Sequence, residues 1–191
     1  QYVSTDLSSE ECSDRNTLAE ICCTISHLRA LQSCIAHFRK CPDAEFWALI
    51  CEDDVDLNPL HTYLSKFNDY VHGRPNDTGI LQLACLSMNA QPNPYDSLHP
   101  YVRWSDDHFS TALYLVTERG LRDIHSRLFV GNVPRIPERK SQSDNILYRC
   151  TSSYTTNFPF VQLQTEESTI HNDHLDFHIE CVERIAVAWE E

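Results

Sequence analysis

Apolar side chains recur at helical spacing over residues 18–38 of this chain. Leucine, isoleucine, cysteine and phenylalanine follow one another at the three- and four-residue steps that place side chains on one face of a helix. Asn16 and Thr17 precede this run, and both belong to the residue types that cap helix N-termini. The pattern therefore predicts one long helix, or two short ones, with a buried face over residues 18–38.

A continuous apolar run over residues 46–51 ends abruptly in acidic side chains. An uninterrupted run of this kind fits a strand that is covered on both faces. The carboxyl end of such a strand opens into the crevice where open α/β sheets bind ligands. Glu52, Asp53, Asp54 and Asp56 follow directly. We call residues 52–56 the acidic segment and expect it to lie at a ligand site.

Segments of helical and of strand character alternate along the rest of the chain, which predicts the α/β class. We expect helices around residues 60–67 and 117–128, strands around residues 80–86, 109–116 and 154–163, and a short apolar segment at 146–148. Thr117 is the expected N-terminal cap of the second of these helices. Residues 89–107 carry prolines and no period, which predicts a long surface loop, and residues 179–189 are expected to form an amphipathic helix.

The composition is that of one domain spanning residues 1–191. The chain is 41% hydrophobic and 23% charged, which is ordinary for a globular protein with a sizeable core. Its formal net charge of −13 argues against a nucleic-acid partner or an anionic membrane surface, because both require clustered Lys and Arg. No apolar stretch approaches the length of a membrane span, and the first residues lack the pattern of a signal peptide.

The sequence bears on the cellular location of the protein and on the oxidation state of its cysteines. A cytoplasmic location is favoured, and the secretory lumen is the alternative because residues 76–78 match the acceptor pattern for N-glycosylation. The 9 cysteines are scattered and include no CxxC pair, so we interpret them as reduced, buried thiols. The alternative is that Cys22 and Cys23, with His27 one helical turn after Cys23, contact a soft metal.

The acidic segment has the side chains of a site for a hard cation. If extended geometry persisted through it, Glu52 and Asp54 would share one side of the strand and Asp53 would face the other. Paired carboxylates favour Mg²⁺ or Mn²⁺, which also take oxygens from a diphosphate. The alternative is that Asp53 or Asp54 merely begins a loop or caps a following helix.

Three separated segments resemble one enzyme family. Residues 20–30 (EICCTISHLRA) carry a Ser-His pair on a predicted helix, residues 48–55 (ALICEDDV) carry a Glu-Asp-Asp motif, and residues 111–121 (TALYLVTERGL) form a predicted strand and helix. In these segments, with weaker similarity at Asp144 and residues 164–170, the chain resembles glycosyltransferase family 25. That family includes lipopolysaccharide and collagen sugar transferases and belongs to the broader GT-A architecture.

The resemblance implies both a fold and an activity. The implied fold is a single α/β/α sandwich with a mostly parallel central sheet. The implied activity is that of a metal-dependent, inverting, hexosyltransferase-like enzyme of the kind used in polysaccharide biosynthesis. It would move a sugar from a UDP- or GDP-sugar to a saccharide or glycoprotein acceptor, with Mn²⁺ or Mg²⁺ neutralising the diphosphate. The family's opening strand and Arg-containing turn have no clear counterpart before residues 13–15, so this strand is either missing or lies outside this sequence.

The resemblance also implies roles for the acids and for a late histidine. Asp54 and Glu52 would bind the metal, and His171 would complete its shell, with His174 as the alternate. Asp53 would accept a hydrogen bond from the ribose or the donor sugar.

Other residues would contact the donor or the acceptor. Asp144 is the candidate base that takes the proton of the acceptor hydroxyl, with Asp106 and Asp107 as substitutes; its alternative role is that of a capping acid. His27 and Arg29 would contact the donor phosphate. The alternatives are that His27 is a half-buried helix histidine bonded to a neighbouring carbonyl and that Arg29 is a solvated surface charge.

Two further classes of protein remain open at this point. One is a metal-dependent phosphodiesterase or nuclease, which would need a second cluster of acids or histidines for a second metal. The other is a non-catalytic or degenerate transferase-like domain that binds carbohydrate.

Overall fold

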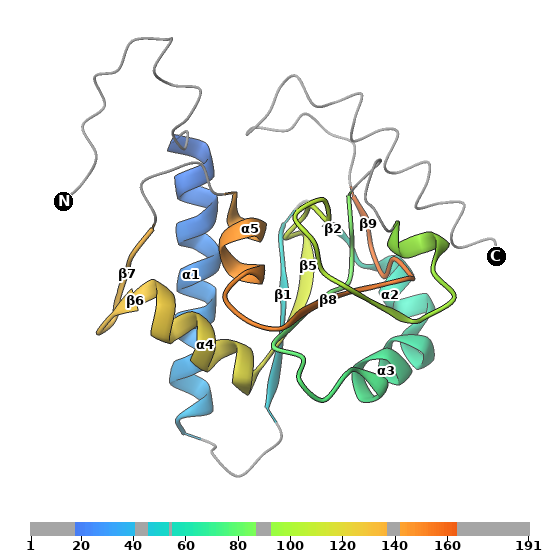
Figure 1. Ribbon diagram of the computed structural model, residues 1–191, viewed down its shortest axis with the longest axis horizontal. Coiled ribbons are helices and arrows are strands. Elements are labelled where there is room, and N and C mark those ends of the chain that lie inside the picture. The colour runs from blue at the N-terminus through green and yellow to red at the C-terminus, as the bar shows by residue number, and fades with distance from the viewer. Residues whose placement is uncertain (1–17, 41–45, 54, 87–92, 137–141, 164–191) are drawn as a thin grey trace.

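The computed structural model describes residues 18–40, 46–53, 55–86, 93–136 and 142–163 (Figure 1). The helices are α1 (Leu18–Phe38), α2 (Asn58–Thr62), α3 (Leu64–Gly73), the 3-10 helix η2 (Pro94–Asp96), α4 (Glu118–Leu128) and α5 (Ser143–Tyr148). The strands are β1 (Trp47–Cys51), β2 (Val55–Asp56), β3 (Ile80–Gln82), β4 (Tyr101–Arg103), β5 (Leu113–Thr117), β6 (Phe129–Val130), β7 (Val133–Pro134), β8 (Ser153–Thr156) and β9 (Gln162–Leu163).

The main sheet has the strand order β1-β5-β3-β8-β4. Strand β5 is antiparallel to both β1 and β3, β3 is parallel to β8, and β8 is antiparallel to β4. Strands β1, β3 and β8 therefore run in one direction, and β5 is inserted between β1 and β3 in the reverse direction. The predicted α/β class is confirmed. A mostly parallel sheet is not confirmed, because the described sheet is mixed and most of its pairings are antiparallel.

Helices lie on both sides of this sheet (Figure 1). Strand β5 is buried along its whole length, and its side chains alternate between the two sides. Tyr114 and Val116 belong to a core shared with α1, α4 and α5, whereas Leu113 and Leu115 belong to a second core that includes Phe67 of α3. The continuous apolar pattern of β5 is thus explained by two cores, one on each face.

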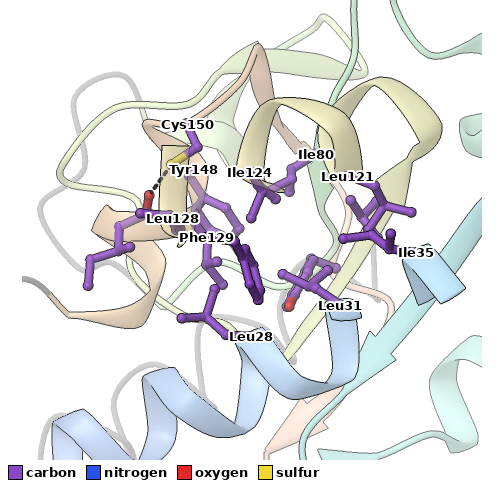
Figure 2. Close-up of a cluster of buried hydrophobic side chains, with 14 residues drawn as sticks. Leu28, Leu31, Ile35, Ile80, Leu121, Ile124, Leu128, Phe129, Tyr148 and Cys150 are labelled. Atoms are coloured by element: carbon purple, nitrogen blue, oxygen red, sulfur yellow. Dashed lines mark hydrogen bonds between the residues drawn. The ribbon is translucent and has the colours of Figure 1, made fainter. Parts of the chain in front are cut away.

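The core on the α1 side packs three helices against the sheet. Figure 2 shows Leu28, Leu31 and Ile35 of α1 facing Leu121 and Ile124 of α4, and these side chains are between 0% and 8% exposed. The helical spacing that predicted a buried face on residues 18–38 is therefore confirmed, and the segment forms one helix. Burial of each such side chain contributes roughly 1.5–3 kcal/mol relative to leaving it in water.

Helix α4 begins and packs as its sequence predicts. Thr117 is its N-terminal cap, and the Thr117 hydroxyl accepts a hydrogen bond from the Gly120 N–H. Gly120 also lets α4 approach β3 closely, because a Cβ at this position would lie 2.2 Å from the carbonyl oxygen of Gly79. No side chain can occupy that space without moving backbone.

Several predicted boundaries differ from the structure. The run over residues 46–51 forms β1 at an end of the described sheet, with Trp47 and Cys51 exposed, and is not covered on both faces as expected. The predicted loop at residues 89–107 contains η2 and the strand β4, which pairs with β8. The strand expected over 109–116 begins only at Leu113, and the predicted helix over 179–189 lies outside the described residues.

Candidate functional site

Polar side chains from four segments meet beside the carboxyl end of β1. Two of them lie on α1, one directly follows β1, one lies two residues before β5, and one is the first residue of α5. We call this group the polar cluster, and its members are Cys23, His27, Glu52, Thr111 and Ser143.

The polar cluster is built around a contact between His27 and Glu52. His27 Nε2 lies 3.0 Å from Glu52 Oε1, and the two side chains are 6% and 30% exposed. On the other side of the ring, His27 Nδ1 lies 3.2 Å from the hydroxyl of Tyr114 on β5. The Glu52 backbone N–H donates to the carbonyl oxygen of Ala112. These contacts fix the imidazole between α1 and the sheet and fix the first acid of the acidic segment.

A chain of hydroxyl contacts extends this pair to α5 and back to α1. The Thr111 hydroxyl donates to Glu52 Oε1 at 2.6 Å and lies 3.1 Å from the Ser143 hydroxyl. Cys23 Sγ lies 3.7 Å from that same Ser143 hydroxyl. Because Cys23 precedes His27 by one helical turn, both face the same side of α1, and the contacts form a closed ring.

The electrostatics of the pair favour the ionised form of both partners. Burial alone would lower the pKa of His27, but hydrogen bonds with Cys23 and Glu52 and the Glu52 charge outweigh it and raise the pKa to about 9. Burial alone would raise the pKa of Glu52, but the hydrogen bonds from His27 and Thr111 and the charge of His27 lower it. An imidazolium can donate from both ring nitrogens, which matches its two observed partners.

Asp144 lies beside the polar cluster in the first turn of α5. This side chain is 6% exposed. Its Oδ2 accepts the backbone N–H of Ser110 at 2.9 Å, and its Oδ1 accepts the backbone N–H of Asn145 at 2.7 Å. Burial raises the pKa of Asp144, although these two backbone N–H groups oppose that rise. The N-cap residue of α5 is Gln142, which makes no side-chain capping bond. The capping box expected over residues 141–144 is not tested, because Ser141 lies outside the described residues.

Ser110 has an unusual backbone conformation at this site. Its φ is 108°, a region that non-glycine residues rarely adopt and that costs of the order of 1–3 kcal/mol. Its carbonyl oxygen accepts from the Tyr148 hydroxyl and from Gln82 Nε2, and its N–H donates to Asp144. Neighbouring side chains thus hold the backbone in a conformation that the residue itself disfavours, which is common at ligand sites.

The other residues predicted to bind the metal, the sugar donor or the acceptor proton do not belong to the polar cluster as the structure describes it. Asp53 is exposed in a turn after β1, so the alternation expected from continued extended geometry does not apply. Arg29 is exposed on α1, whereas His27 is buried. Asp54, His171 and the alternate His174 lie outside the described residues. Asp106, a substitute base, pairs with Arg149.

Sequence reasoning missed several residues of this site. Thr111 is the first residue of the quoted segment 111–121, and Ser143 directly precedes Asp144. Isolated hydroxyl residues give no sequence signal of a site, because only the fold brings them together. Tyr114 was assigned only to a strand, although its hydroxyl orients His27. The spacing of Cys23 and His27 did carry a signal, and the structure adds Glu52 to them. The six described cysteines are free, and Cys22 and Cys51 among them are exposed rather than buried.

None of the described helices has the length and apolar character that crossing a membrane requires. No protein-family model, curated protein or solved structure matches the chain. The resemblance of the quoted segments to a glycosyltransferase family therefore stays a prediction.

Proposed function

We propose that this chain is a glycosyltransferase that moves a sugar from a nucleotide-sugar donor to a saccharide or glycoprotein acceptor. The main support is the convergence of Glu52 and Asp144 where β1 ends and β5 begins. Thr111 donates to Glu52, and the N–H of the preceding residue, Ser110, donates to Asp144, so the segment before β5 contacts both carboxylates. The carboxyl ends of strands that run in one direction are the usual ligand-binding edge of an α/β sheet.

Mn²⁺ or Mg²⁺ belongs to this proposal. Oxygen donors of the acidic segment fit a hard cation, and Asp54, which lies outside the described residues, is the predicted ligand. Asp53 is exposed and is the proposed acceptor of a hydrogen bond from the ribose or the donor sugar. Glu52 Oε1 accepts from His27 and Thr111, and these contacts hold the start of the acidic segment in place. In the proposal Asp54 is the ligand of the Mn²⁺ or Mg²⁺ ion. The ion would supply charge stabilisation for the departing nucleoside diphosphate.

Asp144 is the proposed base that receives the proton of the acceptor hydroxyl. Burial raises its pKa, which moves a carboxyl toward the proton affinity that a general base needs at neutral pH. Each of its oxygens accepts one backbone N–H, and a carboxylate oxygen has a further lone pair for a proton. The two backbone contacts would keep the carboxylate oriented during the transfer.

Membership of glycosyltransferase family 25 and the GT-A architecture are the finer parts of the same proposal. Their support is the set of quoted segments, together with helices on both faces of the sheet and the shared direction of β1, β3 and β8.

Calorimetric titration with nucleoside diphosphates, with and without Mn²⁺, tests the proposal. We expect uridine or guanosine diphosphate to bind only when Mn²⁺ is present, and Asp54→Ala to abolish this binding. Asp69→Ala is the matched control, because Asp69 is an exposed acid on α3. Transfer or hydrolysis of a UDP- or GDP-sugar should show the same dependence.

Three outcomes would each overturn the proposal in a different way. Absence of nucleotide binding would favour a carbohydrate-binding domain. Binding without sugar transfer or hydrolysis would indicate a degenerate transferase. Activity that survives Asp54→Ala would remove the role assigned to the acidic segment.

A further inference from the structure

The polar cluster contains three different metal-ligating groups at close range. Ligand atoms of Cys23, His27 and Glu52 all lie within 4.8 Å of one another. Two come from successive turns of α1 and one from the end of β1, so the arrangement depends on the fold and not on one local motif. A histidine–carboxylate ion pair is complete without a thiol, so the Cys23 thiol beside this pair adds a third metal-ligating group.

Each of the three groups also has a supporting partner. The Tyr114 hydroxyl contacts His27 Nδ1 and so directs Nε2 toward Glu52. Thr111 donates to the Glu52 carboxylate, and the Ser143 hydroxyl lies against Cys23 Sγ. Metal-ligating histidines almost always have such a partner on the second ring nitrogen, and ligating carboxylates are usually hydrogen-bonded as well. The histidine and the carboxylate therefore have the supporting contacts that metal ligands usually have.

We propose that Cys23, His27 and Glu52 bind one Zn²⁺ ion. Thiolate, imidazole and carboxylate are the ligands that Zn²⁺ takes in proteins, whereas Mn²⁺ and Mg²⁺ favour oxygen donors. Three protein ligands leave one coordination position open. This site is distinct from the cation site proposed at Asp54 and does not depend on the proposed glycosyl transfer.

The coordination step requires small movements and a defined loss of protons. Zinc–nitrogen and zinc–oxygen distances are about 2.0–2.2 Å, so the 3.0 Å contact between His27 Nε2 and Glu52 Oε1 opens only slightly to admit the ion. Cys23 coordinates as the thiolate and His27 through a neutral nitrogen, so their protons pass to solvent. Bound Zn²⁺ would fasten α1 to the start of the acidic segment.

Co²⁺ replaces Zn²⁺ with a visible signal and provides the first test. We expect the chelator-treated full chain to bind one Co²⁺, with a thiolate-to-metal charge-transfer band that Zn²⁺ removes by competition. Cys23→Ser should lose this band. Cys22→Ser should keep it, because the Cys22 side chain is exposed and is not part of the polar cluster. Tyr114→Phe should weaken binding by roughly 10–100-fold, as expected for loss of a ligand's supporting partner.

Alkylation of the unmodified chain provides a second test that needs no variant to fold. Peptide mass spectrometry with and without Zn²⁺ should show that the ion protects Cys23 and leaves Cys22 reactive. Mn²⁺ should protect neither thiol. Equal protection of Cys22 and Cys23, no protection of Cys23, or a Co²⁺ band that persists in Cys23→Ser would each overturn the proposal.

Discussion

Replacing Glu52 with glutamine should remove most of the pH dependence of stability that His27 gives the folded chain. His27 is almost fully buried, with its Nε2 3.0 Å from the Glu52 carboxylate, and its pKa is raised from 6.5 to about 9. Each pKa unit corresponds to about 1.4 kcal/mol of preference for the protonated form. The shift therefore corresponds to about 3 kcal/mol of folding stability.

The sign follows from the raised pKa. Folded chains hold the His27 proton more tightly than unfolded chains, so the contribution is fully present below about pH 6.5 and is lost as the pH rises through about 9. The free energy of unfolding of the wild type should fall by about 3 kcal/mol across this window. In Glu52→Gln the carboxylate partner is gone, and we expect a fall of less than about 1 kcal/mol.

Urea unfolding followed by circular dichroism measures this difference. Curves would be recorded near pH 6, 7.5 and 9.5 with a chelator present, so that bound metal does not contribute. Glu118→Gln is the matched control, because it removes the acid of a surface pair with Arg122 and should keep the wild-type slope. The reasoning is refuted if the wild type shows no loss of stability over this window, or if Glu52→Gln loses as much as the wild type.

Three further predictions concern packing and chemistry. Gly120→Ala should destabilise the fold by about 1–3 kcal/mol or more, because the new methyl group would collide with the Gly79 carbonyl; thermal unfolding measures the loss. Leu31→Ala should cost about 2–5 kcal/mol by urea unfolding, because Leu31 is fully buried. Asp144→Asn should lower kcat for sugar transfer by roughly 10²–10⁴-fold with little change in donor binding.

Surface variants supply the comparisons for these measurements. Leu98 is 99% exposed, and Leu98→Ala should stay within about 0.5 kcal/mol of the wild type; a cost equal to that of Leu31→Ala would contradict the burial argument. Wild-type stability in Gly120→Ala would show that α4 and β3 do not approach as closely as described. Asp107 is exposed, and Asp107→Asn should retain transfer activity. Activity that is lost in Asp107→Asn and retained in Asp144→Asn would show that Asp107, and not Asp144, is the base.

The sequence predicted those parts of the fold that depend on local periodicity. The helical spacing over residues 18–38 and the cap at Thr117 were confirmed because both depend on interactions within a few residues. The edge position of β1 was not predictable from the apolar run over residues 46–51, because strand order depends on which distant segment pairs with it. The short strand β4 was missed for the same reason, since its pairing with β8 outweighs the local prolines.

The candidate site was predictable only in part. Glu52, Asp144 and His27 were selected as chemically capable residues, and the structure brings them to one end of the sheet. Their hydrogen-bond partners were not foreseeable, because Thr111 and Ser143 are common residue types whose importance comes from position alone. The roles predicted for Asp54 and His171 remain predictions from the sequence.

Tyr114 belongs to two environments at once. Its ring packs in the core beside Tyr148, and its hydroxyl contacts His27. The hydrophobic interior and the polar cluster thus share one rigid side chain, and a substitution that shifts this ring would also reorient the imidazole. Substitutions that repack the core around Tyr114 to raise thermal stability would therefore also change the orientation of His27. Substitutions in the second core, which contains Phe67 and not Tyr114, would leave this contact in place.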